Sequence, residues 1–225
     1  VERAAQYASQ QGYPVELVPV LDRPDEQTRS LIERRWHHLA PIVTDFGDPG
    51  LARNMGINHA CGDYIAIVDG DDLVSENWFK DACAMNIKNK DCVLHPEKNV
   101  CFGRASIIFS HPDQRDEVFD MTSLSTDNYW TSLCFASRKV FEACPYMSTP
   151  ENSAYGYEDW HWNCEIMYRG YAHRTVPGTA HFIRLKSVGS RNTQSVAKGK
   201  IMRHSSLFET DIYLKPQPNI EAQCL

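Results

Sequence analysis

A short apolar run in this chain ends directly in a cluster of acids. Residues 64–68 read as a buried strand, and the next four residues are Asp69, Gly70, Asp71 and Asp72. Three carboxylates so close together repel one another, and burying them unpaired costs free energy. We therefore expect the cluster just beyond a strand, either as a solvent-exposed acidic turn or as the ligands of a cation.

The spacing of these acids suits a hard divalent cation. Mg²⁺ and Mn²⁺ prefer oxygen ligands at about 2.1 Å, and Mg²⁺ sites typically combine one or two carboxylates with substrate phosphates. A cation held by Asp69 and Asp71 would also relieve the repulsion within the cluster. An Asp-Gly pair is also common in hairpin turns, so the residues alone leave the metal site and the acidic turn both open.

Helix and strand signals alternate through the first half of the chain. The expected helices cover residues 2–11, 26–38, 49–60 and a stretch that begins at 75–76, and the expected strands cover 15–21, 41–44 and 64–68. Strands separated by helices predict βαβ units and a mostly parallel sheet. Ligands of such sheets gather beyond the carboxyl ends of the strands, and both Asp22 and Asp69 follow a strand end.

The second half of the chain is less regular. Short β-like pieces fall at residues 92–95, 106–109 and 130–136, a helix begins near Glu158 and is closed by Gly170, and a strand is expected over 181–186. The sequence shows no internal repeat and no interdomain linker. We therefore expect one α/β domain with an elaborated C-terminal half.

Composition narrows the class of protein. The 225 residues carry a net charge of −6, which disfavours a nucleic-acid partner held by its phosphates. With 42% hydrophobic and 23% charged residues a soluble globular protein is expected, and no apolar run approaches the roughly 18–20 residues that span a membrane. No secretory signal pattern is visible at the start. Eight scattered cysteines without a CxxC pair indicate free, mostly buried thiols in a cytosolic setting.

A longer stretch around the acids resembles a known family. Residues 50–79, GLARNMGINHACGDYIAIVDGDDLVSENWF, are similar to the ARNxGxxxAxGxYIxxxDxDD signature of family 2 glycosyltransferases of the GT-A fold. The residues in register are Ala52, Arg53, Asn54, Gly56, Ala60, Gly62, Tyr64, Ile65, Asp69, Asp71 and Asp72. Upstream, VLDRPDEQT resembles the family's VDDGSTDxT loop, with Asp22 as the remaining acid. Downstream, GYEDWHWNCEIMYRGY resembles GxEDxxxxxRxxxxG apart from its arginine, and HFIRLKSVGS resembles a closing basic segment.

On the donor side, the resemblance implies contacts to a nucleotide-diphospho-sugar. Asp22 would accept hydrogen bonds from the base or ribose, unless it is a helix N-cap or Asx-turn. Arg53 would lie near the diphosphate, unless it forms a surface salt bridge. Asp71 would be the principal ligand of Mn²⁺ or Mg²⁺, and Asp69 would approach the ribose or a metal-bound water. Asp72 is left without a role.

On the acceptor side, the resemblance implies a general base that deprotonates the attacking hydroxyl. Asp159 matches this base, and Glu158 would help to place the acceptor. Both acids begin the expected helix, whose dipole favours the ionised form that a base requires. Acids in a first helical turn also stabilise helices without doing chemistry, which is the alternative.

The expected strand over 181–186 carries basic residues. Arg184 and Lys186 would share one face with Phe182. The resemblance implies that Arg184 and Lys186 contact the diphosphate and that His181 reaches the metal once the donor binds. The alternative is an exposed basic strand face with a packed histidine.

The start of the chain departs from the family pattern. Family members usually begin with an apolar strand of the VSVVIPxYN kind that lines the base pocket, whereas this sequence starts at Val1 in what should be the following helix. Either that strand is absent from the given sequence or this region has diverged. If it is absent, the strand over 15–21 lacks a central neighbour, which leaves a sheet edge unpaired.

The resemblance implies a division of the chain and an activity. We expect a GT-A-type, Rossmann-like domain over 1–225, with a nucleotide-sugar-binding half to about residue 90, an acceptor-side half over about 91–195 and a C-terminal extension over about 196–225. The implied activity is metal-dependent, inverting transfer from a nucleotide-diphospho-sugar, above all a UDP-sugar, to a glycan or lipid-linked hydroxyl. The expected setting is assembly of surface polysaccharide in the cytoplasm or at the inner face of the membrane.

Two rival functions remain open at this point. A sugar nucleotidyltransferase would need a glycine-rich, basic phosphate loop near the N-terminus, and the sequence shows none. A non-catalytic nucleotide-sugar or glycan-binding module would use Asp71 but would have no need of a base at Asp159.

Overall fold

The computed structural model describes residues 1–90, 92–186 and 191–209, apart from the side chains at 191 and 192. The helices are α1 (Glu2–Gln10), α2 (Glu26–Trp36), α3 (Pro49–His59), α4 (Trp78–Lys88), α5 (Arg138–Ala143), α6 (Glu158–Tyr168) and α7 (Arg191–Ala197). The strands are β1 (Val20–Asp22), β2 (Ile42–Thr44), β3 (Tyr64–Ile67), β4 (Leu73–Val74), β5 (Cys92–Gly103), β6 (Ile107–Ser110), β7 (Cys134–Ser137), β8 (Tyr155–Gly156), β9 (Ala172–Leu185) and β10 (Ile201–Met202).

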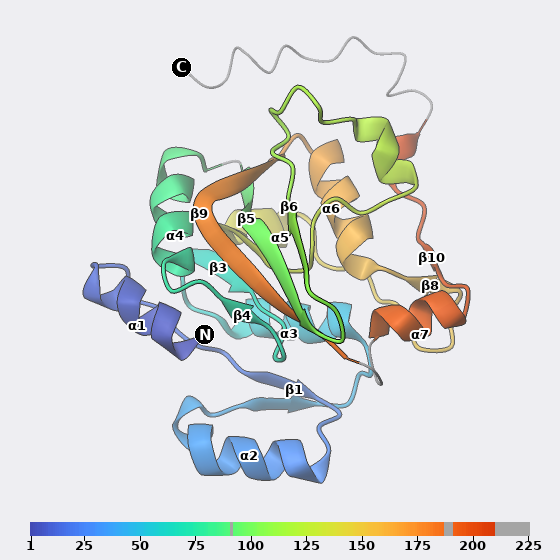
Figure 1. Cartoon of the computed structure of the whole chain (residues 1–225). Helices are drawn as coiled ribbons and strands as arrows, with labels where there is room; N and C mark the ends of the chain where they lie inside the picture. Colours follow the sequence, from blue (N-terminus) through green and yellow to red (C-terminus); the bar gives the residue numbers. More distant parts are fainter. Residues whose placement is uncertain (91, 187–190, 210–225) are drawn as a thin grey trace.

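A curled, mixed sheet of six strands forms the centre of the molecule (Figure 1). Its order is β3-β7-β5-β9-β4, with β6 paired to β5. The long β5–β9 pair is parallel, whereas the β3–β7, β5–β7, β5–β6 and β4–β9 pairs are antiparallel. The α/β class is therefore confirmed, but the expectation of a mostly parallel sheet is wrong. Short connections such as the one between β5 and β6 can join only antiparallel neighbours, because a parallel pair needs a long crossover.

The strands β1 and β2 form a separate parallel pair below the central sheet in Figure 1. The expected strand over 15–21 is reduced to Val20–Asp22, because the residues just before it have no partner strand among those described. Val15 and Leu17 instead pack against the buried cluster that α1 and α4 share. Among the described strands, β1 therefore pairs with β2 alone.

The helix α1 lies against α4 through small side chains (Figure 1). Ala4 and Ala8 are 2% and 0% exposed and belong to the same buried cluster as Trp78 and Ala82 of α4. Removing this apolar surface from water supplies the main stabilisation of the α1 contact. Because β5 and β7 contribute to the same cluster through Leu94 and Phe135, α1 and α4 are fixed on the central sheet.

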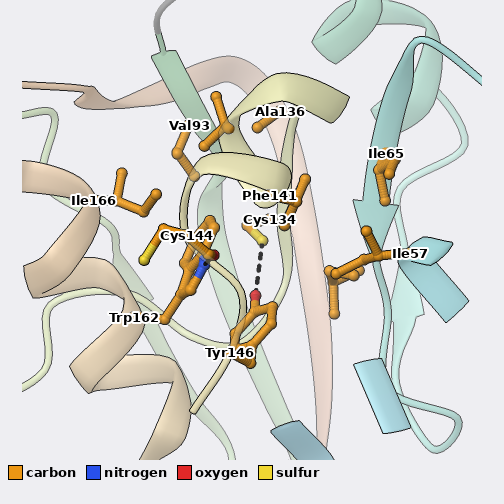
Figure 2. Packing of buried hydrophobic residues seen from close by; sticks show 12 residues of the cluster. Ile57, Ile65, Val93, Cys134, Ala136, Phe141, Cys144, Tyr146, Trp162 and Ile166 are labelled. Carbon is orange, nitrogen blue, oxygen red and sulfur yellow. Dashed lines mark hydrogen bonds between the residues drawn. The ribbon is translucent and has the colours of Figure 1, made fainter. Parts of the chain in front are cut away.

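A second buried cluster anchors α6 next to β3 and β7 (Figure 2). Trp162 of α6 stacks between Phe141 and Tyr146, with ring centroids 5.2 and 4.9 Å away. Its indole nitrogen donates to the carbonyl oxygen of Cys144 at 2.7 Å. Ile67, the last residue of β3, belongs to this cluster. The first turn of α6 is therefore held close to the acids that follow β3.

Two further expectations concern cysteines and membrane spans. The seven described cysteines are free and five of them are buried, which agrees with the expectation of free, mostly buried cysteines. Cys224 lies outside the described residues. Within the described part of the chain, no helix has both the length and the apolar character needed to cross a membrane.

Candidate active site

Each acid of the cluster after β3 faces its own basic side chain. The three pairs are Asp69 with Arg53 at 3.1 Å, Asp71 with Lys186 at 2.6 Å, and Asp72 with His181 at 2.8 Å. The basic partners come from α3, from the residue after β9 and from β9 itself. The opposite charges of Arg53 and Lys186 offset the repulsion within the cluster, and Asp72 shares a hydrogen bond with the His181 ring. The cluster is thus neither a free acidic turn nor a set of carboxylates without partners.

Arg53 joins the acid cluster to the start of α6. Its Nη2 donates to Asp69 at 3.1 Å, and its Nη1 donates to Oε1 of Glu158 at 2.6 Å. The arginine side chain is only 11% exposed. Burial lowers the pKa of the Arg53 guanidinium, but the charges of Asp69 and Glu158 outweigh burial and hold that pKa well above its usual range. The surface salt bridge is therefore excluded as a description of Arg53, and its contact with a diphosphate stays a prediction.

Asp69 is held in its ionised form. Burial raises the pKa of its carboxyl, but the Arg53 charge and a hydrogen bond from the Ser132 hydroxyl lower it more, so that the pKa lies below its usual value. The Ser132 oxygen lies 2.8 Å from Oδ2 of Asp69. Asp69 is therefore a fixed negative charge at the end of β3.

The pKa of Asp159 is shifted upward, in the opposite direction to that of Asp69. Burial, followed by the charge of neighbouring Glu158, raises the pKa of Asp159 to about 7, and Arg53 offsets only part of this rise. The start of the helix favours the ionised form, but burial and a like charge outweigh that effect here. A carboxylate with a pKa near neutral pH is well matched to taking a proton from a hydroxyl.

Residues 127–132 supply side chains that the sequence analysis did not identify. Nδ2 of Asn128 lies 3.4 Å from Oδ2 of Asp159, and Oδ1 of Asn128 accepts from Nδ2 of Asn163 at 3.3 Å. Ser132 contacts Asp69, and Thr131 contacts His181. The only sequence signal was a loose resemblance of residues 127–141 to the acceptor-proximal region of the family, which carried no residue-level pattern.

His181 lies among packed side chains. It is 1% exposed, its Nε2 faces Asp72, and its Nδ1 lies 3.1 Å from the Thr131 hydroxyl. Its two ring nitrogens are thus both engaged, which matches the packed histidine that the sequence left as an alternative. In the described part of the chain, no group of three or more His, Cys, Asp or Glu side chains is arranged to hold a metal. The predicted set of Asp69, Asp71 and His181 is therefore not assembled here.

Asp71 retains the chemistry of a metal ligand. Its side chain is 45% exposed, and it offers carboxylate oxygens of the kind that Mg²⁺ and Mn²⁺ bind. Such cations are typically held by one or two carboxylates together with substrate phosphates. Asp71 therefore fits a cation site that a bound diphosphate completes, whereas His181 does not fit one in its present position.

Asp22 organises the loop after β2. Its carboxylate accepts hydrogen bonds from the Thr44 hydroxyl and from the backbone N–H groups of Phe46, Gly47 and Asp48, at 2.7 to 3.1 Å. Partial burial raises the pKa of Asp22, but these donors lower it more, so that the net shift is downward. These partners lie 22 to 26 residues further along the chain, so Asp22 is neither the helix N-cap nor the Asx-turn residue that the sequence left as alternatives. Its contact with a nucleotide stays a prediction.

The other predicted donor residues lie apart from the Arg53 bridge. Asp22 borders a cavity of about 240 Å³ that Arg23, Glu151, Lys198 and Lys200 also line. Arg184 is exposed on β9, two residues before Lys186. The structure therefore brings Arg53, Asp69, Glu158 and Asp159 together, and it places Asp22 and Arg184 outside this group.

Solved structures with a similar fold come from glycosyltransferases. Staphylococcus aureus TarS residues 1–349 with UDP-GlcNAc superimposes with a TM-score of 0.57, at 17% identity, over 87% of this chain and 61% of that one. The UDP complex of the same TarS fragment has a TM-score of 0.55, at 19% identity, over 76% of this chain and 51% of that one. GalNAc-T7 with UDP, GalNAc and Mn²⁺ gives 0.52 at 16% identity, over 78% and 39% of the two chains. The fold is therefore that of GT-A glycosyltransferases.

Sequence comparison agrees with the fold. The family model described as "Glycosyl transferase family 2" matches residues 2–142. The chain is 31% identical over 83 residues to the poly(ribitol-phosphate) beta-N-acetylglucosaminyltransferase TarS of Staphylococcus aureus, which is 35% of this chain and 14% of that protein. The chain belongs to glycosyl transferase family 2. The matched segment covers only a small part, 14%, of the length of this TarS relative.

Proposed function

We propose that this chain carries the donor site and the catalytic base of a metal-dependent, inverting glycosyltransferase. The donor is a nucleotide-diphospho-sugar, with UDP-sugars as the first candidates, and the acceptor is a hydroxyl of a glycan or of a lipid-linked carrier. Family membership supports this proposal, as does the similarity to TarS, which has been solved with UDP and with UDP-GlcNAc.

The observation that carries the proposal is the position of Arg53. It holds Asp69 and Glu158 together, so that the acids after β3 and the acids of α6 share one site. Sugar transfer requires both sides in one place, because the leaving group departs on one side of the anomeric carbon and the acceptor attacks on the other. A non-catalytic nucleotide-binding module would have no need of the acids of α6 on the acceptor side.

Asp159 supplies the base for this reaction. Its carboxylate takes the proton of the acceptor hydroxyl, and the oxygen forms a bond to the anomeric carbon. The bond from that carbon to the phosphate oxygen breaks, and its electron pair leaves with the nucleoside diphosphate. Attack from the side opposite the leaving group inverts the anomeric configuration. Since burial raises the pKa of Asp159 to about 7, its conjugate acid is stable enough to hold the proton at neutral pH.

Asp71 would hold a divalent cation, which supplies positive charge to the leaving diphosphate. Asp69 is kept ionised and oriented by Arg53 and Ser132, so it adds a fixed acceptor for a ribose hydroxyl or a water molecule beside Asp71. Asn128 orients the Asp159 carboxylate through its amide nitrogen, which lies 3.4 Å from Oδ2 of Asp159. We place the reaction in the cytoplasm or at the inner face of the membrane, in assembly of a surface polysaccharide.

Ligand-dependent stability tests the donor part of this proposal. Wild-type protein should be stabilised by UDP or a UDP-sugar in the presence of Mn²⁺, by about 2.7 kcal/mol at a hundredfold excess over Kd. Asp71→Asn should lose the effect of Mn²⁺. Asp63→Asn is the matched control, because Asp63 is an exposed acid just before β3. If no nucleotide sugar raises the melting temperature with or without Mn²⁺, the proposed donor site is wrong.

A further inference from the structure

The ion pair between Asp71 and Lys186 differs from the other two pairs of the acid cluster. Its side chains are 45% and 38% exposed, and their charged atoms lie 2.6 Å apart. His181 is 1% exposed, and Arg53 is 11% exposed and bound to two carboxylates. Asp69, the partner of Arg53, is itself 39% exposed, so the Asp71–Lys186 pair is set apart as the one of the three in which both side chains are well exposed.

The pair is also inexpensive to break. Exposed ion pairs contribute little to stability, because water and salt screen the charges and the long lysine side chain loses freedom when it is held. Lys186 directly follows Leu185, the last residue of β9, whose carbonyl accepts from the N–H of Arg104 at 3.2 Å. The backbone just before Lys186 is thus anchored to the sheet, and its ammonium group can move without disturbing β9.

We propose that Lys186 is a built-in counter-ion of Asp71, and that a divalent cation binds by displacing its ammonium group. The ammonium and the cation compete for the same carboxylate lone pairs, and their like charges repel each other. Lys186 therefore neutralises Asp71 before the donor arrives and must leave when a metal occupies the site. The inference rests on the proposed function, because it takes Asp71 as the metal ligand.

The displaced ammonium group needs a new anionic partner. In the proposed function, that partner is the diphosphate of the donor, which approaches the same cation and carries several phosphate oxygens. Lysine pairs with phosphate as a compact, mobile point charge, which suits a group that changes partner. Lys186 thus serves as counter-ion to Asp71 in the empty site and to the diphosphate in the loaded one.

Binding of Mn²⁺ alone tests the exchange without any catalytic assay. The EPR signal of free Mn²⁺ reports the affinity of wild type, Lys186→Met, Lys98→Met and Asp71→Asn. We expect K186M to bind Mn²⁺ about two- to fivefold more tightly than wild type, because the competing charge is gone. K98M removes an equally charged and similarly exposed lysine that pairs with Glu97, and it should bind as wild type does. D71N should lose binding.

For a nucleoside diphosphate, wild type should bind more tightly than K186M, which is the reverse of the order expected for Mn²⁺ alone. With Mn²⁺ at saturating concentration, calorimetry should show that K186M binds UDP about fivefold more weakly than wild type or K98M, because a charged contact is missing. A lysine with only a structural role would not shift the two affinities in opposite directions. Tighter Mn²⁺ binding together with weaker UDP binding is the result expected.

The alternatives are separated by the same measurements. Equal Mn²⁺ affinity in wild type and K186M, with loss in D71N, would overturn the exchange and leave the proposed metal site intact. UDP binding that K186M leaves unchanged would overturn the second role of Lys186. If wild type and K186M bind no Mn²⁺ either alone or together with UDP, the metal dependence of the proposed function is wrong, and the exchange is wrong with it. Binding only in the presence of UDP, with equal affinity in both proteins, would overturn the exchange alone.

Discussion

Nη1 of Arg53 lies 2.6 Å from Oε1 of Glu158, although the two residues are 105 positions apart in the chain. The same guanidinium donates to Asp69 through its other terminal nitrogen at 3.1 Å. The helix α3 therefore sets the distance between the acids after β3 and the first turn of α6. An arginine is suited to this role, because its planar, forked donors can bind two carboxylates at once.

Replacing Arg53 with methionine should destabilise the fold. Methionine keeps much of the side-chain volume but leaves Glu158 and Asp69 without their partner. We expect a loss of about 2–4 kcal/mol in the free energy of unfolding, below the value for a fully buried pair because Asp69 is 39% exposed. Urea denaturation at pH 7.5 measures it. Arg3→Met is the control, because the Arg3–Glu76 pair is 86% and 53% exposed and its loss should cost less than about 0.5 kcal/mol. Similar losses of unfolding free energy in both variants would show that the contacts of Arg53 with Asp69 and Glu158 do not stabilise the fold.

The rate of sugar transfer should depend on pH through Asp159. The base works in its ionised form, and burial raises its pKa to about 7. We therefore expect kcat/KM to rise tenfold per pH unit below about pH 7 and to level off above it. Initial rates from pH 5.5 to 9 with a saturating cation test this dependence. A rate that is flat from pH 5.5 to 8 would exclude Asp159 as the titrating base.

The raised pKa of Asp159 also predicts a stability effect of the opposite sign to the activity effect. The folded chain binds the Asp159 proton more tightly than the unfolded chain, in which an aspartate titrates near about 3.9. As the pH rises from about 4 to 7, the unfolded state loses this proton first, so the fold loses stability across that window. Asp159→Asn has no charge to bury and should be more stable than wild type at pH 8, with a smaller difference at pH 4.5. Chemical denaturation at the two pH values measures both differences. Lower stability of D159N at pH 8 would show that the carboxylate is not destabilised in the fold.

Buried histidines predict sensitivity to mild acid. Nε2 of His95 lies 2.9 Å from Nδ1 of His173, and both rings stack on Trp130. Burial lowers the pKa of His173 to about 3 and the pKa of His111 to about 4. The pKa of His95 lies well below its usual range, mainly because of burial and secondly because of its interaction with His173. As the pH falls from about 6.5, the unfolded chain binds protons that the folded chain does not, so stability is lost by up to about 1.4 kcal/mol per pH unit for each histidine.

The slope of stability against pH tests this prediction. Denaturation midpoints between pH 5 and 6.5 should fall in wild type, and the fall should be shallower in His173→Gln, which cannot bind the proton in either state. This range lies above the titration of ordinary carboxylates. Asp159, whose pKa is raised to about 7, opposes the histidines there, but it is one group against three, so the histidines set the sign of the slope. An identical slope in the variant would show that His173 is already protonated or exposed in the fold.

Local features of the fold were predictable from the sequence. The ends of α1, α3 and α6 lie within two residues of their expected positions, because Gly12, Gly62 and Gly170 follow soon after the last helical turns. The strand β3 and the acids beyond it were predictable for the same reason, since an apolar run followed by charges is a local pattern. The direction of strand pairing was not, because it depends on which distant segments meet. β4, for example, is two residues of the acid loop that pair with β9.

In the candidate site, too, local features could be predicted from the sequence and contacts between distant segments could not. The sequence indicated that Asp69, Asp71 and Asp72 needed opposite charge, and it suggested a metal as the source. The structure instead places Arg53 of α3 and Lys186 after β9 opposite Asp69 and Asp71, and the His181 ring beside Asp72. The positions of these partners follow from tertiary packing alone. The sign of the Asp159 pKa shift was missed for a related reason, because the helix start is visible in the sequence while the burial of its first turn is not.

The central claim is that Asp159 acts as the base on a donor that the acids after β3 help to hold. Donor affinity and transfer rate should therefore be measured side by side for wild type and Asp159→Asn, with Mn²⁺ and a UDP-sugar that the stability screen identifies. The account predicts that D159N binds the donor within about twofold of wild type and transfers the sugar about 10²- to 10⁴-fold more slowly. Transfer by D159N at the wild-type rate would contradict it.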